Sequence, residues 1–287
     1  MGRPVTTVRR MRLGMELRRL REQAQVSQIN AAEAIDGSDA KTSRVESGKT
    51  GLNRLELTAL LDLYGVTDER FRSGLLELNR TSRQRGWWQQ RSDIVNPQLQ
   101  ELIELESTAS QIFEYEAIVI PGLFQTEEYA HAVISGFPPP HNPPIGQAVQ
   151  IRLERQKLLE RDDAPRIICI LDEAVLHRQV GTPKTMAAQL RALKKVNNPP
   201  RLSIQVIPYT SGAHTGTDGS FRLFTYPAPA DMDICFPEQK ASRVFIEEET
   251  GLEPYRVAAE HLRTQALSSP ESMRLIAGIA AEFDGKG

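Results

Sequence analysis

The sequence contains little cysteine and no long apolar run. Its two cysteines, Cys169 and Cys235, lie within the apolar stretches IICIL and DICF, which excludes a disulfide framework and predicts buried thiols. No stretch approaches the roughly 20 apolar residues that span a bilayer. The first residues, MGRPVTTVRR, lack the apolar middle of a signal peptide. We therefore expect a cytoplasmic protein without a membrane partner.

Catalytic and cofactor motifs are also missing. The five histidines, at positions 131, 141, 177, 214 and 261, never take the spacing of a metal-binding helix such as HExxH. The sequence has no GxSxG elbow, Walker A loop or dinucleotide-binding GxGxxG. We expect a protein that is not an enzyme and that holds no metal and no cofactor.

Charge is distributed unevenly along the 287 residues, although the net charge is only −2. The chain through Arg91 has 17 Lys/Arg and 11 Asp/Glu, a net of +6, whereas the remainder has 18 and 26, a net of −8. A basic first part suits a polyanion such as nucleic acid, although an ordinary solvated surface remains an alternative. The length is that of about two domains.

Residues 13–80 show the apolar spacing of several short helices around one small core. In the first helix, Leu13, Leu17 and Leu20 recur on one face. A fourth helix over about 53–64 is expected to bury Leu55, Ala59, Leu60 and Leu63. The succession of helices is that of a helix-turn-helix unit.

The third helix of this unit is the candidate recognition helix. Ser38 is expected to cap it, and Gly37 to take the positive φ of the preceding turn. Thr42 and Val45 have the spacing of a buried stripe. The candidate base-reading residues are those on the faces that packing leaves outward: Asp39, Ala40, Lys41, Ser43 and Arg44.

Chemistry divides these residues into different roles. Arg44 suits a bidentate contact to guanine, whereas Lys49 and Arg54 suit phosphates. Asp39 has two interpretations: it accepts a hydrogen bond from cytosine N4, or, as we favour, it stabilises the helix amino end through the dipole. Glu46 is expected to pair internally, since DNA repels its charge.

The remainder of the chain predicts an α+β domain. Strand and helix patterns alternate at first, and later strands follow one another as hairpins. The expected organisation is a flexible basic arm over residues 1–12, an all-α helix-turn-helix domain over 13–80, a linker over 81–98 and an α+β domain over 99–284.

One loop of the second domain is a candidate ligand or partner site. YTSGAHTGTDGS, residues 209–220, contains His214, Thr215, Thr217 and Asp218 among small residues whose N–H groups cradle anions in other proteins. A long hairpin loop without a ligand is the alternative, and we favour it. A small-molecule pocket would be lined by this loop and by residues 121–124.

The first domain resembles the Cro/C1-type (XRE) helix-turn-helix family. The shared motifs are Ser27-Gln28 at the start of the second helix, Ala31-Ala32, and the run SRVESGK from residue 43 to 49. The resemblance implies that Gln28 and Ser38 contact phosphates and that outward residues of the third helix read bases. Ile35-Asp36-Gly37 departs from the family's usual turn, in which glycine follows the apolar residue directly.

The second domain resembles the Scr1-like antitoxin domain that follows such a helix-turn-helix in many actinobacterial regulators. The successive motifs are IPGLFQTEEYA, VQIRLERQKLL, LDEAVLHRQVG, LSIQVIP and QALSSPES. The resemblance implies a regulator that works with a small, separately encoded partner protein in a toxin–antitoxin-like or developmental switch.

These observations predict a sequence-specific transcriptional regulator that binds double-stranded DNA. We expect a homodimer, because two units on adjacent half-sites match palindromic DNA. The second domain is expected to be antitoxin-like, binding the small partner protein, mediating dimerisation, or both. The alternative is a ligand-sensing regulator with a small-molecule pocket in that domain.

Overall fold

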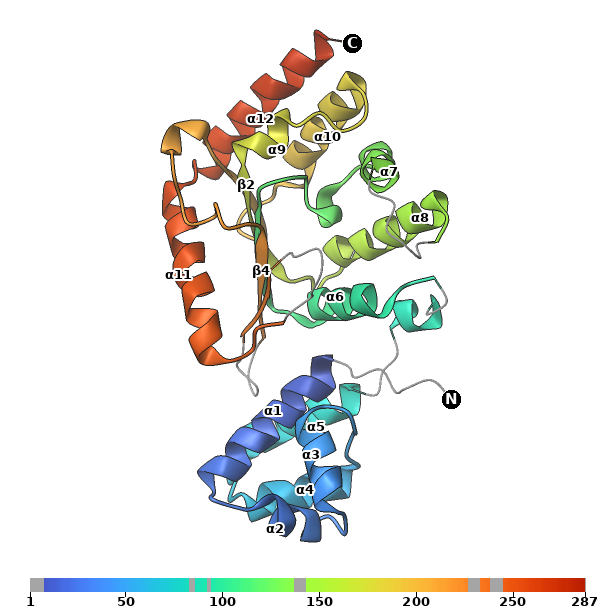
Figure 1. The fold of residues 1–287 in the computed structure, drawn as a ribbon, viewed down its shortest axis with the longest axis vertical. Helices are drawn as coiled ribbons and strands as arrows, with labels where there is room; N and C mark the ends of the chain where they lie inside the picture. Colours follow the sequence, from blue (N-terminus) through green and yellow to red (C-terminus); the bar gives the residue numbers. More distant parts are fainter. Residues whose placement is uncertain are drawn as a thin grey trace. The chain divides into compact units, whose positions relative to one another are not determined.

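The computed structural model describes residues 8–82, 86–91, 94–136, 143–226, 233–237 and 245–286. The chain divides into two compact units (Figure 1). The first comprises Met1–Thr108 with Tyr226–Met232, and the second comprises Ala109–Thr225 with Asp233–Gly287. An all-α helix-turn-helix region followed by an α+β domain confirms the predicted fold class.

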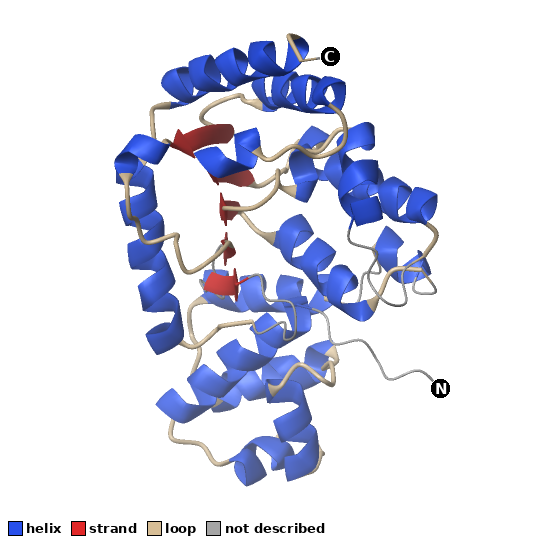
Figure 2. Ribbon diagram, turned by 45° about the horizontal axis from the view of Figure 1, so that its top comes forward, coloured by secondary structure: helices blue, strands red, loops and turns tan. Residues whose placement is uncertain are grey.

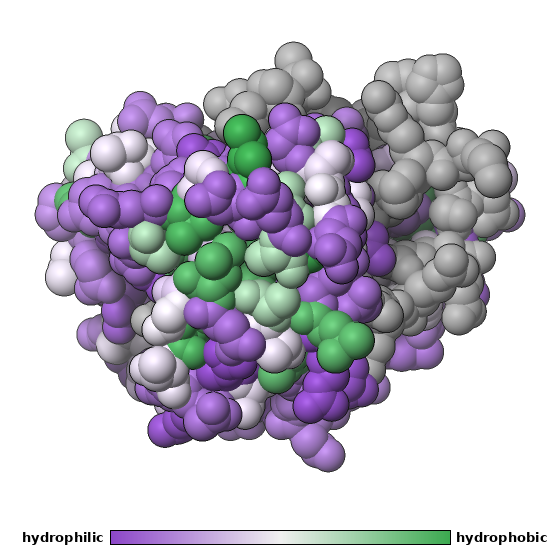
Figure 3. All heavy atoms as spheres, turned by 90° about the horizontal axis from the view of Figure 1, so that it is seen from below, coloured by the Kyte–Doolittle hydropathy of each residue, from purple (hydrophilic) through white to green (hydrophobic). Residues whose placement is uncertain are grey.

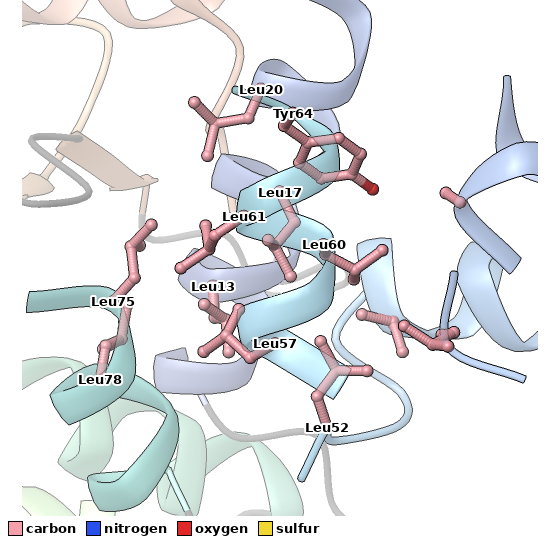
Figure 4. Packing of buried hydrophobic residues seen from close by; sticks show 13 residues of the cluster. Leu13, Leu17, Leu20, Leu52, Leu57, Leu60, Leu61, Tyr64, Leu75 and Leu78 are labelled. Atoms are coloured by element: carbon pink, nitrogen blue, oxygen red, sulfur yellow. The ribbon is translucent and has the colours of Figure 1, made fainter. Parts of the chain in front are cut away.

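The head, residues 8–82, consists of five helices. They are α1 (Val8–Gln23), α2 (Gln28–Glu33), α3 (Asp39–Glu46), α4 (Arg54–Leu63) and α5 (Glu69–Thr81). Leucines from α1, α4 and α5 interlock in one core, to which Leu52 and Tyr64 also belong (Figure 4). After the head, the first unit continues with a 3-10 helix over Trp87–Arg91 and with α6 (Pro97–Thr108).

Helix α1 begins earlier than expected. Residues 8–12 were predicted to belong to a flexible arm, but they are helical. Arg12 is buried, and its guanidinium lies 4.1 Å from the ring centre of Tyr226, also in the first unit. The prediction missed this because a basic run has no apolar period, although an aromatic ring can cover an arginine. The predicted arm over residues 1–7 lies outside the described residues.

Of the four residues predicted to be buried on α4, Leu60 is buried and the other three are not. Leu55 is 81% exposed and Leu63 is 39% exposed, whereas Leu57 and Leu61 are completely buried. Asn53 and Glu56 form a capping box that fixes where the helix starts. The positions that face the core are 57, 60, 61 and 64, a stripe that shares only position 60 with the predicted one.

The turn before α3 also differs from the prediction. The residue with positive φ is Asp36, at 47°, and not Gly37. The Gly37 N–H donates to the Ala32 carbonyl at 2.9 Å, which closes the end of α2. Aspartate is among the few residues other than glycine that adopt this conformation readily.

Two other glycines let α1 lie directly on the end of α3. A Cβ atom on Gly14 would lie 2.4 Å from the Val45 carbonyl oxygen. Gly48 has a φ of +70°, and a Cβ atom there would lie 2.8 Å from the backbone of Met11. Any larger side chain at Gly14 would separate the two helices.

The second unit is built on a five-stranded sheet in the order β3-β2-β1-β4-β5. Figure 2 shows its strands in red among the helices. The strands are β1 (Gln111–Glu116), β2 (Arg166–Asp172), β3 (Leu202–Ile207), β4 (Phe221–Thr225) and β5 (Asp233–Pro237). β1, β2 and β3 are parallel, while β4 and β5 are antiparallel to their neighbours. The chain must therefore pass from β3 at one edge to β4 beside β1, and residues 208–220 make this crossing.

Helices cover both faces of the sheet (Figures 1 and 2). α11 (Glu249–Gln265) packs on the face that carries Phe113, Ile170 and Leu223. The other helices of this unit are α7 (Glu127–Gly136), α8 (Ile145–Gln156), α9 (Glu173–His177), α10 (Pro183–Val196) and α12 (Ser269–Asp284). α10 and α12 lie side by side, and α12 also contacts β3. No helix within the described residues is long and apolar enough to cross a membrane.

Both cysteines are buried in the sheet, as predicted. Burial raises the pKa of Cys235 to about 12 and that of Cys169 well above its usual value. Both thiols therefore stay protonated near neutral pH, and the thiolate is the reactive form. We expect neither thiol to react with Ellman's reagent in the native protein and both to react in denaturant. Stoichiometric labelling of the native protein within minutes would contradict this burial.

Candidate nucleic-acid interface

Helix α3 presents one polar face to solvent. The Ser38 hydroxyl caps the helix by accepting from the Lys41 N–H at 3.2 Å. Thr42 and Val45 are buried, as predicted. The exposed residues of the helix are Asp39, Ala40, Ser43 and Arg44.

Arg44 is the residue of this face best suited to reading a base. Its side chain is exposed, and it makes no hydrogen bond or ion pair within the described part of the chain. The guanidinium is planar and presents paired donors, which match the O6 and N7 acceptors of guanine. Its position in the last turn of α3 is fixed by the buried Val45 beside it.

Lys41 is placed differently from Arg44. Its ammonium lies 2.6 Å from Glu56 Oε1, and its side chain is only 25% exposed. The other oxygen of Glu56 accepts from the Asn53 N–H at 2.7 Å. One carboxylate thus caps α4 and also holds it against the first turn of α3. A base contact by Lys41, which remains a prediction, would require it to leave Glu56.

Asp39 also has a local partner. Its Oδ1 accepts from the Ala40 N–H at 2.7 Å, at the amino end of the helix. This placement matches the favoured interpretation, in which the carboxylate stabilises the positive end of the helix dipole. Ala40, whose side chain is a single methyl group, is exposed beside it.

A buried carboxylate joins three helices of the head, α1, α2 and α3. Glu46, at the end of α3, accepts from Arg21 of α1 at 2.5 and 3.2 Å and from Gln28 of α2 at 3.0 Å. Hydrogen bonding to Glu46 raises the pKa of Arg21. Burial, together with the charge of Glu46, raises the pKa of Tyr64 to about 12. The internal pairing of Glu46 was expected, but the roles of Arg21 and Gln28 in it were not.

The ends of α3 lie beside the amino ends of two other helices. The Lys41–Glu56 pair places its start next to α4, and the Gln28–Glu46 hydrogen bond places its end next to α2. Eight helical residues span about 12 Å, which is about the width of the major groove of B-DNA. Arg54, in the first turn of α4, and Lys49, just after α3, are both exposed. Of the other two residues predicted to contact phosphate, Ser38 is exposed and Gln28 is half-buried.

Apolar side chains interrupt the hydrophilic surface of the head. Ile29 is 62% exposed, and Leu55 and Leu63 are exposed as well. Figure 3 shows one face of the molecule on which small hydrophobic areas lie among hydrophilic ones. Exposed apolar groups of this size are common on proteins.

The candidate ligand loop of the second unit is tied to the carboxyl ends of the parallel strands. His214 Nε2 lies 3.2 Å from Asp172 Oδ2, and the His214 side chain is 7% exposed. The Gly216 N–H donates to His214 Nδ1 at 3.2 Å, which leaves the proton on Nε2. Tyr115 packs edge-on against the imidazole, with ring centres 5.9 Å apart.

The side chains of Thr215, Thr217 and Asp218, also predicted for this site, do not take part in the contact between His214 and Asp172. The Thr215 and Thr217 hydroxyls are exposed and donate to the Ala258 and His214 carbonyls, respectively. Asp218 is exposed. The polar contacts of this loop therefore hold residues 208–220 against the carboxyl end of β2 and against α11. Among the described residues, no group of three or more side chains is arranged to hold a metal ion.

The strands also contain a buried ion cluster that the sequence analysis missed. Arg222 of β4 donates to Glu114 of β1, its direct cross-strand neighbour, and to Glu116 Oε1 at 2.9 Å. All three side chains are nearly inaccessible to solvent. Charges at alternate positions of QIFEYE were the available signal, because they share one face of a strand.

Removal of the Glu46 carboxylate tests its role in joining the helices. We expect Glu46→Ala to lower the free energy of opening of α1 and α3 by about 2–3 kcal/mol, because Arg21 and Gln28 lose a charged acceptor. Hydrogen–deuterium exchange of amides in these helices measures the effect in the full chain. Glu77→Ala, which removes an exposed partner of Arg80 and leaves the Glu46 cluster intact, is the control and should change the exchange little. Equal protection in Glu46→Ala and the wild type would disprove the role.

Comparison with known proteins finds one family for the head and another for most of the remaining chain. Residues 12–73 match a family described as a helix-turn-helix domain. Residues 99–278, more than half of the chain, match the family described as Domain of unknown function (DUF5753). No curated protein and no solved structure matches the chain. The protein therefore belongs to the DUF5753 family and carries a DNA-binding helix-turn-helix domain ahead of the domain that defines that family.

Proposed function

We propose that the protein is a homodimeric, sequence-specific regulator of transcription whose α3 enters the major groove. The observation that carries the proposal is the exposed, unpaired Arg44 guanidinium on a helix braced by Glu46 from two sides. The braced helix fixes the position of the Arg44 backbone, and the planar guanidinium presents its donors in a fixed geometry, which favours a bidentate contact to guanine.

The residues of α3 divide into primary and secondary base readers according to whether their side chains already have partners within the protein. Arg44, Ser43 and Ala40 read bases directly, with the Ala40 methyl suited to contact a thymine methyl. Lys41 and Asp39 are secondary readers, because each already has an internal partner.

The phosphate contacts lie on either side of the groove. Lys49 and Arg54 are exposed cations for this role. Ser38 and Gln28 contribute neutral hydrogen bonds, and Gln28 does so while it remains bonded to Glu46. This arrangement positions the helix while leaving sequence discrimination to the residues of α3.

We further propose that the second unit binds a small, separately encoded partner protein, as the resemblance to Scr1-like antitoxin domains implies. The loop of residues 208–220 offers less support for the ligand-sensing alternative. His214 is already bonded to Asp172. Leu123 and Phe124, in the other segment expected to line a pocket, are buried.

Substitution of Arg44 tests the reading of DNA. We expect Arg44→Ala to reduce discrimination between a duplex selected from a random pool and its scrambled version by about 1–3 kcal/mol. Arg44→Lys retains the charge but not the bidentate geometry, so it should bind random DNA normally and still lose discrimination. Anisotropy titrations at constant salt provide both affinities.

The matched control is Arg80→Ala, which removes an equal charge from α5 while its partner Glu77 stays exposed. It should keep the discrimination of the wild type. If Arg44→Ala discriminates as well as Arg80→Ala, Arg44 is not a reader.

The full-length tagged chain, captured from a native extract, tests partner binding. We expect a small protein to co-elute at a stoichiometric level, and mass spectrometry identifies it. A bound metabolite in place of a protein would favour the ligand-sensing alternative. Light scattering of the purified chain measures the predicted homodimer mass.

A further inference from the structure

A groove runs along the seam between α10 and α12 in the second unit. It encloses about 580 Å³. Leu190 from α10 and Ile276 and Ala280 from α12 form its buried apolar lining. The two helices are held at one end by the Asn197–Ser269 hydrogen bond, of 3.0 Å, and Arg191 bridges to Asp284 at 2.6 Å. The walls of the groove are therefore fixed relative to each other.

The exposed wall on α12 has an unusual composition for a solvated helix. Ala277 and Ala281 line the groove and face solvent at positions of the helix where charged side chains are the rule. Small side chains permit a second helix to approach closely, since the distance between packed helices depends on the residues at their contact.

The opposite wall is basic. Lys194 and Lys195 line the groove from the last turn of α10, are exposed and form no ion pair within the described residues. Cations in a last turn offset the helix dipole, which explains the lysines but not the apolar hollow beside them. The chain after Arg91 has 18 basic and 26 acidic residues, so this basic wall is a local exception.

We propose that the groove binds an acidic amphipathic helix of a partner protein. Apolar side chains of that helix fill the hollow, and its carboxylates pair with Lys194 and Lys195. The lining on α12 extends from residue 276 to 284, about 12 Å or two helical turns. This length suits anchors at positions i, i+4 and i+7, as in other helix-in-groove complexes. The inference deepens the partner-binding role proposed above and rests on it.

A display library of 16-residue peptides, panned against the full-length protein, tests the groove. We expect the enriched peptides to combine apolar residues at helical spacing with Asp or Glu on one flank. Calorimetry with the most enriched peptide should show binding at least tenfold weaker to the double variant Lys194→Glu/Lys195→Glu. Lys184→Glu changes an exposed lysine at the other end of α10 and should bind as the wild type does.

Several results would overturn the inference. Enriched peptides without acidic residues, or equal affinity for the double variant, would exclude this groove as an acidic-helix site. A lower mass of the double variant in light scattering would make the groove a contact between copies of this chain. If no helical peptide is enriched but dodecanoate binds the wild type in calorimetry and not the double variant, the groove is a site for an anionic amphiphile. Capture from a native extract is repeated with the double variant. A partner that the double variant retains would refute the groove and leave the partner-binding role standing, whereas no partner on the wild type would refute that role.

Discussion

The buried carboxylate of Glu46 is the constraint on which the head depends. It is the shared acceptor for Arg21 and Gln28, so one charge connects α1, α2 and α3. An unpaired carboxylate at this depth would be costly, which means that the three helices must assemble together. Gly14 complements this arrangement, because only a residue without a side chain lets α1 reach the end of α3. The orientation of the exposed face of α3 follows from these two contacts.

In the second unit, buried ion pairs join two strands of the sheet, as Glu46 joins helices of the head. Arg222 is placed between Glu114 and Glu116, which discourages slippage of β4 against β1, because a shift of one residue would send the charges to the opposite face. His214 similarly ties the long crossing between β3 and β4 to Asp172. In both units, polar contacts specify an arrangement that apolar packing alone would leave less well defined.

The sequence was sufficient for the fold class, the position of α3 and the burial of Thr42 and Val45, because apolar periodicity and capping residues are local signals. It was insufficient where the outcome depended on distant residues. Leu55 is exposed because α4 packs Leu57, Leu60 and Leu61 against leucines of α1 and α5, and residues 8–12 are helical although no apolar period marks them. The partners of Lys41 and Gln28 lie 15 and 18 residues further along the chain, beyond the reach of pattern analysis.

The Lys41–Glu56 pair has a kinetic consequence for a protein that scans DNA. Non-specific affinity grows with the number of phosphates that free cations neutralise, through the release of condensed counterions. Glu56 removes one cation from that number, and the neutral Gln28 adds none. Weak attraction to random sequence shortens each unproductive stop, so in the regulator proposed above the time spent searching a genome depends in part on the acidic Glu56.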